Sequence, residues 1–178
     1  EVASQWSEIF EKPIKTIFEA HLLNYLKQQP WLKNKEAAFR VATIQEVIPF
    51  SLDNSDIVYL TFIAIEDDRG SAGQNTYLMP LIYLSDAELV RKNTEAIITH
   101  LKFSSLPKGA GAIFDALYLP RFYSAFLQLM VSPEKIQGKL GGLVGSIIKE
   151  NKVTLGLKSC MLPIHLYHSS HGHVDVHF

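Results

Sequence analysis

The chain has little cysteine and no excess of charge of either sign. Its 178 residues include one cysteine, Cys160, so no disulfide can form within the chain, and such a composition is typical of the reducing cytoplasm. Lysine and arginine together number 17, against 18 aspartate and glutamate residues. That balance leaves no basic surface of the strength that attracts nucleic acid. We therefore expect a cytoplasmic protein without a nucleic-acid partner.

Long apolar segments are missing as well. A helix that spans a membrane needs roughly 20 consecutive apolar residues, and the apolar stretches here, such as 63–65 and 77–84, are short. The amino terminus has neither an initiating methionine nor the charged-then-apolar order of a signal peptide. We expect a soluble protein with no membrane partner, and a sequence that was processed or is part of a longer chain.

The order of the patterned segments predicts an α+β fold. With 47% hydrophobic and 20% charged residues, the chain has a globular composition. Residues 13–28 have apolar side chains at helical spacing, whereas 38–50, 56–66 and 76–84 are rich in the β-branched and aromatic residues of strands. Pro80 suits an edge strand or a bulge better than a central strand. We expect an antiparallel β-sheet packed against helices.

More specific expectations follow for the first helix and for the segments between residues 66 and 103. The predicted buried face of the first helix consists of Ile14, Ile17, Phe18, His21, Leu22 and Tyr25. His21 is then a core or boundary residue, because a metal ligand needs companions. Residues 66–75 should form a solvated loop, 85–91 a turn of helix and 95–103 a further strand.

The most informative stretch is 111–130, with the sequence GAIFDALYLPRFYSAFLQLM. An apolar lead-in is followed by Pro120, which suits the first turn of a helix. The predicted buried stripe of that helix is Leu119, Phe122, Tyr123, Phe126, Leu127 and Met130, with Arg121, Ser124 and Gln128 outside. Asp115 lies between the two parts, and we interpret it as a turn or capping residue and not as a catalyst.

The glycine cluster at 138–145 follows a second helix start, in which Ser132 is the cap and Pro133 the first helical residue. Successive glycines can cradle a phosphate. A P-loop, however, needs its lysine directly after the last glycine, and Lys139 precedes the later ones. We interpret the cluster as a flexible turn or a helix cap that marks a domain edge.

Three collinear segments resemble the N-terminal cap domain of maltokinases, including those fused to trehalose synthase, within the aminoglycoside-phosphotransferase-like kinase group. Residues 29–35, QPWLKNK, are similar to a turn with Trp31 and a nearby basic residue, although two glycines of the family turn are replaced. Residues 75–84, NTYLMPLIYL, resemble the strand in which an aromatic and two apolar residues precede Pro-Leu. Residues 113–117, IFDAL, resemble the family's Asp-Ala-Leu signature. The similarity runs from 10 to 152.

The resemblance implies a cap domain of cystatin-like architecture over 1–131, followed by a glycine-rich connector and a divergent histidine-rich segment over 132–178. Full-length relatives would use ATP and Mg²⁺ to phosphorylate maltose to maltose 1-phosphate. The catalytic loop of the group reads His-Gly-Asp-x-His-x-x-Asn, and the closest text here, 171–175, lacks its Asp and Asn. We expect no catalytic or cofactor-binding residue in this chain. The expected partners are kinase lobes of the same polypeptide, trehalose synthase or a second copy.

The carboxyl-terminal histidines support an alternative hypothesis, in which the chain binds a metal ion. Five histidines and Asp175 lie within 165–177, a density that suits Zn²⁺ and similar ions. If 173–178 is a strand, His173, Asp175 and His177 share one face and can reach one ion. The chain would then be a small metal-binding module, or the segment is a terminal strand that takes up zinc adventitiously. A free-standing regulatory or interaction domain is the other alternative.

Overall fold

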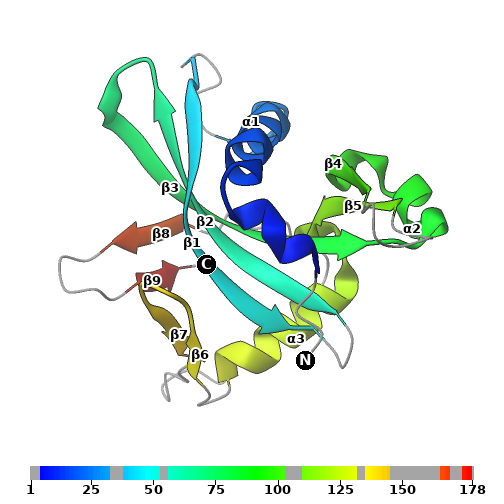
Figure 1. Cartoon of the computed structure of the whole chain (residues 1–178). Coiled ribbons are helices and arrows are strands. Elements are labelled where there is room, and N and C mark those ends of the chain that lie inside the picture. The colour runs from blue at the N-terminus through cyan, green and yellow to red at the C-terminus, as the bar shows by residue number, and fades with distance from the viewer. Residues whose placement is uncertain are drawn as a thin grey trace.

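The computed structural model describes residues 5–32, 38–52, 56–102, 110–131, 135–144, 165–168 and 174–177. For residues 5, 70–74, 131, 165–168 and 174–177 it describes the backbone alone. The expected α+β fold is confirmed: an antiparallel sheet of five strands is packed between helices (Figure 1).

The sheet has the strand order β1-β2-β3-β5-β4, and every neighbouring pair is antiparallel. Its strands are β1 (Val41–Ser51), β2 (Ile57–Asp67), β3 (Gly70–Leu84), β4 (Ile97–Lys102) and β5 (Ala110–Asp115). Beside it, β8 (His165–His168) pairs with β3 and with β9 (Val174–His177), while β6 (Lys135–Gln137) and β7 (Gly142–Val144) form a separate hairpin.

Helices cover both faces of the sheet. In Figure 1, η1 (Gln5–Phe10) and α1 (Ile14–Leu26) lie in front of the sheet, and α3 (Pro120–Val131) passes behind its lower part. The short elements α2 (Ala87–Lys92), η2 (Thr94–Ala96) and η3 (Ala116–Tyr118) connect the strands and α3. Alternate residues of β2 enter different cores: Ile63 packs under α1, and Leu60 packs under α3. This explains the almost continuous apolar run of β2, because a sheet buried on both faces cannot have a polar side.

A bulge in β1 divides that strand between the two cores. The register with β2 shifts by one residue at Gln45, and one extra residue reverses the alternation of side chains. Before the shift, Ala42 and Ile44 lie in the core under α1. After it, Ile48 and Phe50 lie in the core under α3.

The prediction of the first helix is confirmed, but its predicted buried face is wrong in part. Phe18, Leu22 and Tyr25 are buried, whereas Ile14 and Ile17 are 43% and 61% exposed. His21 is exposed too, so it is not a core residue. The reason is that the first turns of α1 lie beside the edge of β1, which they contact through charged side chains, and this orientation turns both isoleucines to solvent.

The predicted loop at 66–75 is a tight turn between two long strands. β2 continues to Asp67 and β3 starts at Gly70. The Asp67 carboxylate is buried and accepts hydrogen bonds from the backbone N–H of Arg69 at 2.9 Å and from its Nε at 3.0 Å. These bonds hold the pKa of Asp67 below its usual value. A local ion pair therefore closes the hairpin where we expected a solvated loop.

Pro80 does not lie in an edge strand, contrary to the expectation from its missing N–H. It is buried in β3 and lies opposite Leu60 of β2. On the other side of β3, the pairing with β5 begins only at Leu81. Pro80 thus lies one residue outside the β3–β5 ladder, so a central strand can accommodate it.

The second amphipathic segment is largely as expected. The helix α3 begins at Pro120; Phe122 and Phe126 are buried, and Arg121 is exposed. Leu129, which the predicted stripe omitted, is also buried. The helix predicted to start at Ser132 has its first three residues, 132–134, outside the described residues. From Lys135 onward the prediction is wrong, because Lys135–Gln137 form the strand β6 and the glycines form the turn of a hairpin.

Gly111 lies where β5 packs closely against β3, so a larger residue at this position tests the packing. A Cβ at this position would lie 2.5 Å from the carbonyl oxygen of Leu84 and 2.6 Å from the ring of Tyr83. Overpacking of this kind costs about 1–3 kcal/mol, so Gly111→Ala is expected to lower the free energy of unfolding by that amount in urea denaturation. The control is Gly141→Ala, whose Cβ would meet no atom within 4 Å. An equal effect of both substitutions would contradict the prediction.

Candidate functional site

The most unusual polar group of the described chain is the carboxyl group of Asp115, in the family-like IFDAL segment. Asp115 ends β5, where the strand turns into η3, and its side chain is 1% exposed. Its Oδ1 accepts the backbone N–H of Leu117 at 2.9 Å, which caps η3. The interpretation of Asp115 as a turn or capping residue is confirmed.

A second hydrogen bond joins Asp115 to the first helix. The Tyr25 hydroxyl donates to Asp115 Oδ2 at 3.1 Å across 90 residues of sequence. Tyr25 comes from the last turns of α1, so this bond connects that helix to the end of β5. Next to it, the Tyr123 hydroxyl of α3 donates to the carbonyl oxygen of Leu117 at 2.6 Å. Elements from three parts of the chain therefore meet at η3.

Burial shifts the proton affinities of this cluster. Burial raises the pKa of Asp115 to about 6, although the bonds from Leu117 and Tyr25 act in the opposite direction. Burial and the neighbouring carboxylate also raise the pKa of Tyr25 beyond its usual range. The pKa of Tyr118 is raised for the same two reasons. The phenols therefore remain protonated donors at neutral pH.

This arrangement can hold a structure together but offers little for catalysis. A general acid or base must reach a proton of its substrate, whereas Asp115 is buried and directed at Tyr25 and Leu117 within the protein. The other deeply buried carboxylate, Asp67, is paired with Arg69.

The sequence-predicted metal residues stay a prediction. His173 lies outside the described residues, and Asp175 and His177 lie in β9, of which the structure describes the backbone alone. That backbone pairs β9 with β8 in antiparallel register, with His177 opposite His165. In the part of the chain whose side chains are described, no three His, Cys, Asp or Glu residues are grouped so that they could hold a metal ion.

Trp31, the tryptophan of the family-like QPWLKNK segment, lies against the sheet. It is half-buried and packs on Tyr77, with ring centroids 5.9 Å apart. Its neighbour Leu32 is more deeply buried, at 2% exposure. The turn after α1 is therefore attached to β3 by one ring contact and to the core by a leucine.

The comparison with protein families places this cluster in context. The model of the maltokinase N-terminal cap domain matches residues 25–118, more than half of the chain. This chain belongs to the maltokinase N-terminal cap domain family. The match begins at Tyr25 and ends at Tyr118, so all five strands of the main sheet and Asp115 lie within it. A comparison with curated protein sequences finds no match.

Two further observations concern the helices of the cap domain and its IFDAL segment. No helix in the described ranges has the length and apolar character needed to cross a membrane. The IFDAL segment, from which the sequence resemblance was drawn, is the segment whose aspartate binds the first helix. Sequence analysis assigned Asp115 to a cap but missed Tyr25 as its partner, because nothing in the spacing of two residues 90 positions apart indicates a contact.

The pKa of Asp115 predicts a pH dependence of stability. The carboxyl group has an ordinary pKa of 3.8, against about 6 in the folded cap domain. Because the folded state binds the proton more tightly than the unfolded state does, protonation of Asp115 stabilises the fold. This contribution to the free energy of unfolding is complete below about pH 3.8 and is lost as pH rises through about 6. Relative to Asp115→Asn, which cannot titrate, the wild type should lose up to roughly 3 kcal/mol of unfolding free energy across this window. Urea denaturation at a series of pH values measures it, and a constant difference would contradict it.

The hydrogen bond from Tyr25 predicts a second effect. Tyr25→Phe keeps the ring in the core but removes one of the two donors to Asp115. Leaving a buried acceptor short of a partner costs about 1–3 kcal/mol, and the pKa of Asp115 should rise further. Chemical denaturation and NMR titration of the carboxyl carbon measure the two effects. Tyr77→Phe, a partly buried tyrosine that packs against the same core under α1, is the control for loss of a hydroxyl group.

Proposed function

We propose that the chain is the noncatalytic cap of a maltokinase-like protein, which covers and stiffens the amino-terminal kinase lobe. The observation that carries this proposal is the family match over 25–118. Full-length relatives are taken to phosphorylate maltose to maltose 1-phosphate with ATP and Mg²⁺, in trehalose and α-glucan metabolism. The single cysteine favours the cytoplasm as the compartment.

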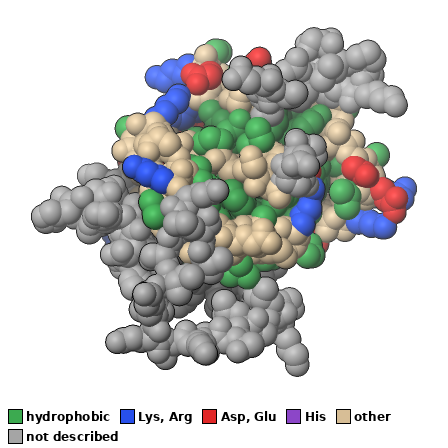
Figure 2. Space-filling model, turned by 90° about the horizontal axis from the view of Figure 1, so that it is seen from below, with side chains coloured by type: hydrophobic (Ala, Val, Ile, Leu, Met, Phe, Trp, Pro, Cys, Tyr) green, Lys and Arg blue, Asp and Glu red, His purple; other side chains and the backbone are tan. Residues whose placement is uncertain are grey.

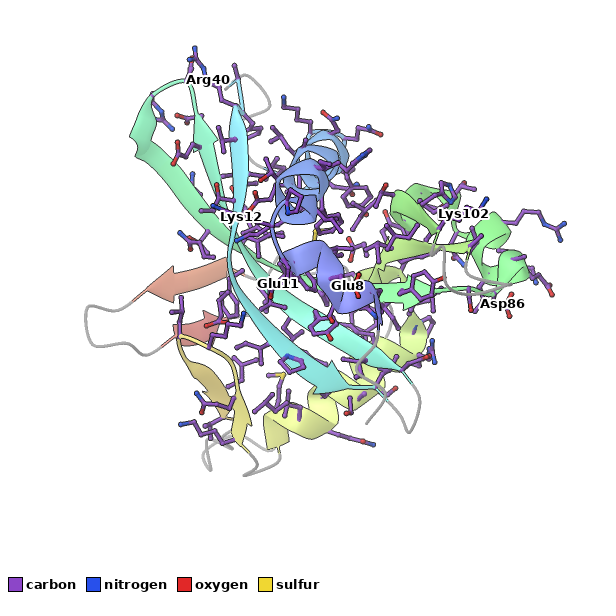
Figure 3. All side chains as sticks on the ribbon, in the orientation of Figure 1. Glu8, Glu11, Lys12, Arg40, Asp86 and Lys102 are labelled. Carbon is purple, nitrogen blue, oxygen red and sulfur yellow. The ribbon has the colours of Figure 1, made fainter. Side chains whose placement is uncertain are left out.

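The surface supports a role in contacts with other protein. Figure 2 shows apolar side chains gathered in the middle of the face seen from below, with charged side chains nearer its rim. Of the charged residues labelled in Figure 3, Arg40, Asp86 and Lys102 lie on outer parts of the fold, whereas Glu8, Glu11 and Lys12 lie over the middle of the view. Apolar surface of this kind is typical of protein interaction sites. The proposed partners are kinase lobes of the same polypeptide and trehalose synthase.

The proposal predicts binding without catalysis. The 178-residue chain, incubated with maltose, ATP and Mg²⁺, should form no maltose 1-phosphate above the enzyme-free rate, measured by ³¹P NMR. The chain should bind kinase lobes produced without their cap, or trehalose synthase, in isothermal titration calorimetry. Phosphorylation by the chain alone would overturn the noncatalytic role, and binding to neither protein would overturn the role as a cap.

A further inference from the structure

The edge strand β1 has backbone groups that are bound by side chains where another strand would normally bind. The N–H of Ile44 donates to Glu19 Oε1 at 2.8 Å, and the carbonyl oxygen of Ile44 accepts from Lys15 Nζ at 2.8 Å. Both side chains come from α1. An unpaired edge presents free N–H and C=O groups on which a strand of another chain can pair. At Ile44, α1 occupies both groups.

Beyond the bulge, the next outward positions of β1 are closed in other ways. Pairing alternates along a strand, so after the shift at Gln45 the backbone groups of Val47 and Pro49 face away from β2. The N–H of Val47 donates to Glu46 Oε1 at 2.9 Å, and Pro49 has no N–H. The outward donors of Ile44 and Val47 are thus both occupied, and the one at Pro49 does not exist.

Glu46 also holds the β6–β7 hairpin over this edge. Its Oε1 accepts the backbone N–H of Lys139 at 3.2 Å, and its Oε2 accepts that of Leu140. The hairpin approaches closely: a Cβ at Gly138 would lie 2.8 Å from Ile48 and 3.1 Å from the Glu46 carboxyl carbon. A single carboxylate therefore accepts three backbone N–H groups, one from β1 and two from the tip of the hairpin.

Among the residues that the structure describes, other contacts hold the hairpin only weakly. Its strands have three residues each, and Leu140 and Val144 are 80% and 60% exposed. The ion pair of Lys139 with Glu11, at 3.6 Å, joins two side chains on the surface, where such a pair adds little. Figure 3 shows Glu11 on the connection from η1 to α1. Ile136 and Leu143 pack on the core only partly buried, so the position of the hairpin depends largely on Glu46.

We propose that Glu46 is a latch: it keeps the hairpin of residues 135–144 over the β1 edge, and together with Lys15 and Glu19 it prevents a second copy of this chain from pairing there. The occupant of an opened edge would be β1 of another molecule. β1 has 11 residues, rich in valine and isoleucine, and two opened copies of one strand are complementary in antiparallel order around a two-fold axis. The latch goes beyond the proposed cap function and does not depend on it.

The latch is tested by Glu46→Ala, with Glu11→Ala as the matched control. Amide hydrogen exchange by NMR should become at least about tenfold faster at Val47, Lys139 and Leu140 in the first variant. In the control, which removes only the exposed ion pair, exchange should stay unchanged. Unchanged exchange in Glu46→Ala would overturn the latch. If that variant does not fold, Leu140→Pro removes one of the same bonds from the hairpin side, and unchanged exchange at Lys139 would overturn it equally.

The closure of the edge is tested by the triple variant Lys15→Ala, Glu19→Ala and Glu46→Ala. We expect its molar mass by light scattering to rise with concentration toward that of a dimer, while the wild type and Glu11→Ala keep one mass. Exchange at Ile44 should be faster in dilute solution and protected again in the dimer. A triple variant with a released hairpin that stays monomeric at about 1 mM would overturn the pairing with a second copy. Neither outcome depends on whether the chain binds kinase lobes.

Discussion

The hydrogen bond between Tyr25 and Asp115 joins the two ends of the family-matched region. It attaches the end of α1 to the point where β5 turns into η3, and the same carboxylate caps η3 through Leu117. All five strands of the main sheet lie between Tyr25 and Asp115 in the sequence. Because the carboxylate is buried, its two donors must stay in place, or the cost of an unpaired buried acceptor disrupts the junction.

This constraint gives the IFDAL segment of the cap domain a structural role, at the junction of α1, β5 and η3. The carboxylate of Asp115 accepts hydrogen bonds from donors within the protein, and the carboxylate of Asp67 is paired with Arg69 in the β2–β3 turn. Both carboxylates shape turns of the chain. Its edge at β1 is closed by carboxylate and ammonium groups, which keeps the sheet from extending by strand addition.

Much of the fold could be predicted from local patterns. The helix at α1, the strands β1 to β3 and the start of α3 at Pro120 follow from periodicity and from residues that start or stop elements. The errors at Ile14, Ile17 and Pro80 have one physical origin. Ile14 and Ile17 look like core residues, and Pro80 looks like an edge residue, because sequence alone does not show which neighbour lies beside each position. The bulge at Gln45 and the contact of Tyr25 with Asp115 are likewise tertiary.

The sequence by itself determined the α+β class, the resemblance to the cap family and the capping role of Asp115, because each rests on residues close together in the chain. The tertiary structure decided which side chains close the β1 edge, how the pKa of Asp115 shifts and where the glycine-rich hairpin lies. These properties depend on burial and on contacts across many residues, such as those of Glu46 with Lys139 and Leu140. Spacing along the chain carries no information about such contacts, which arise only when distant segments pack.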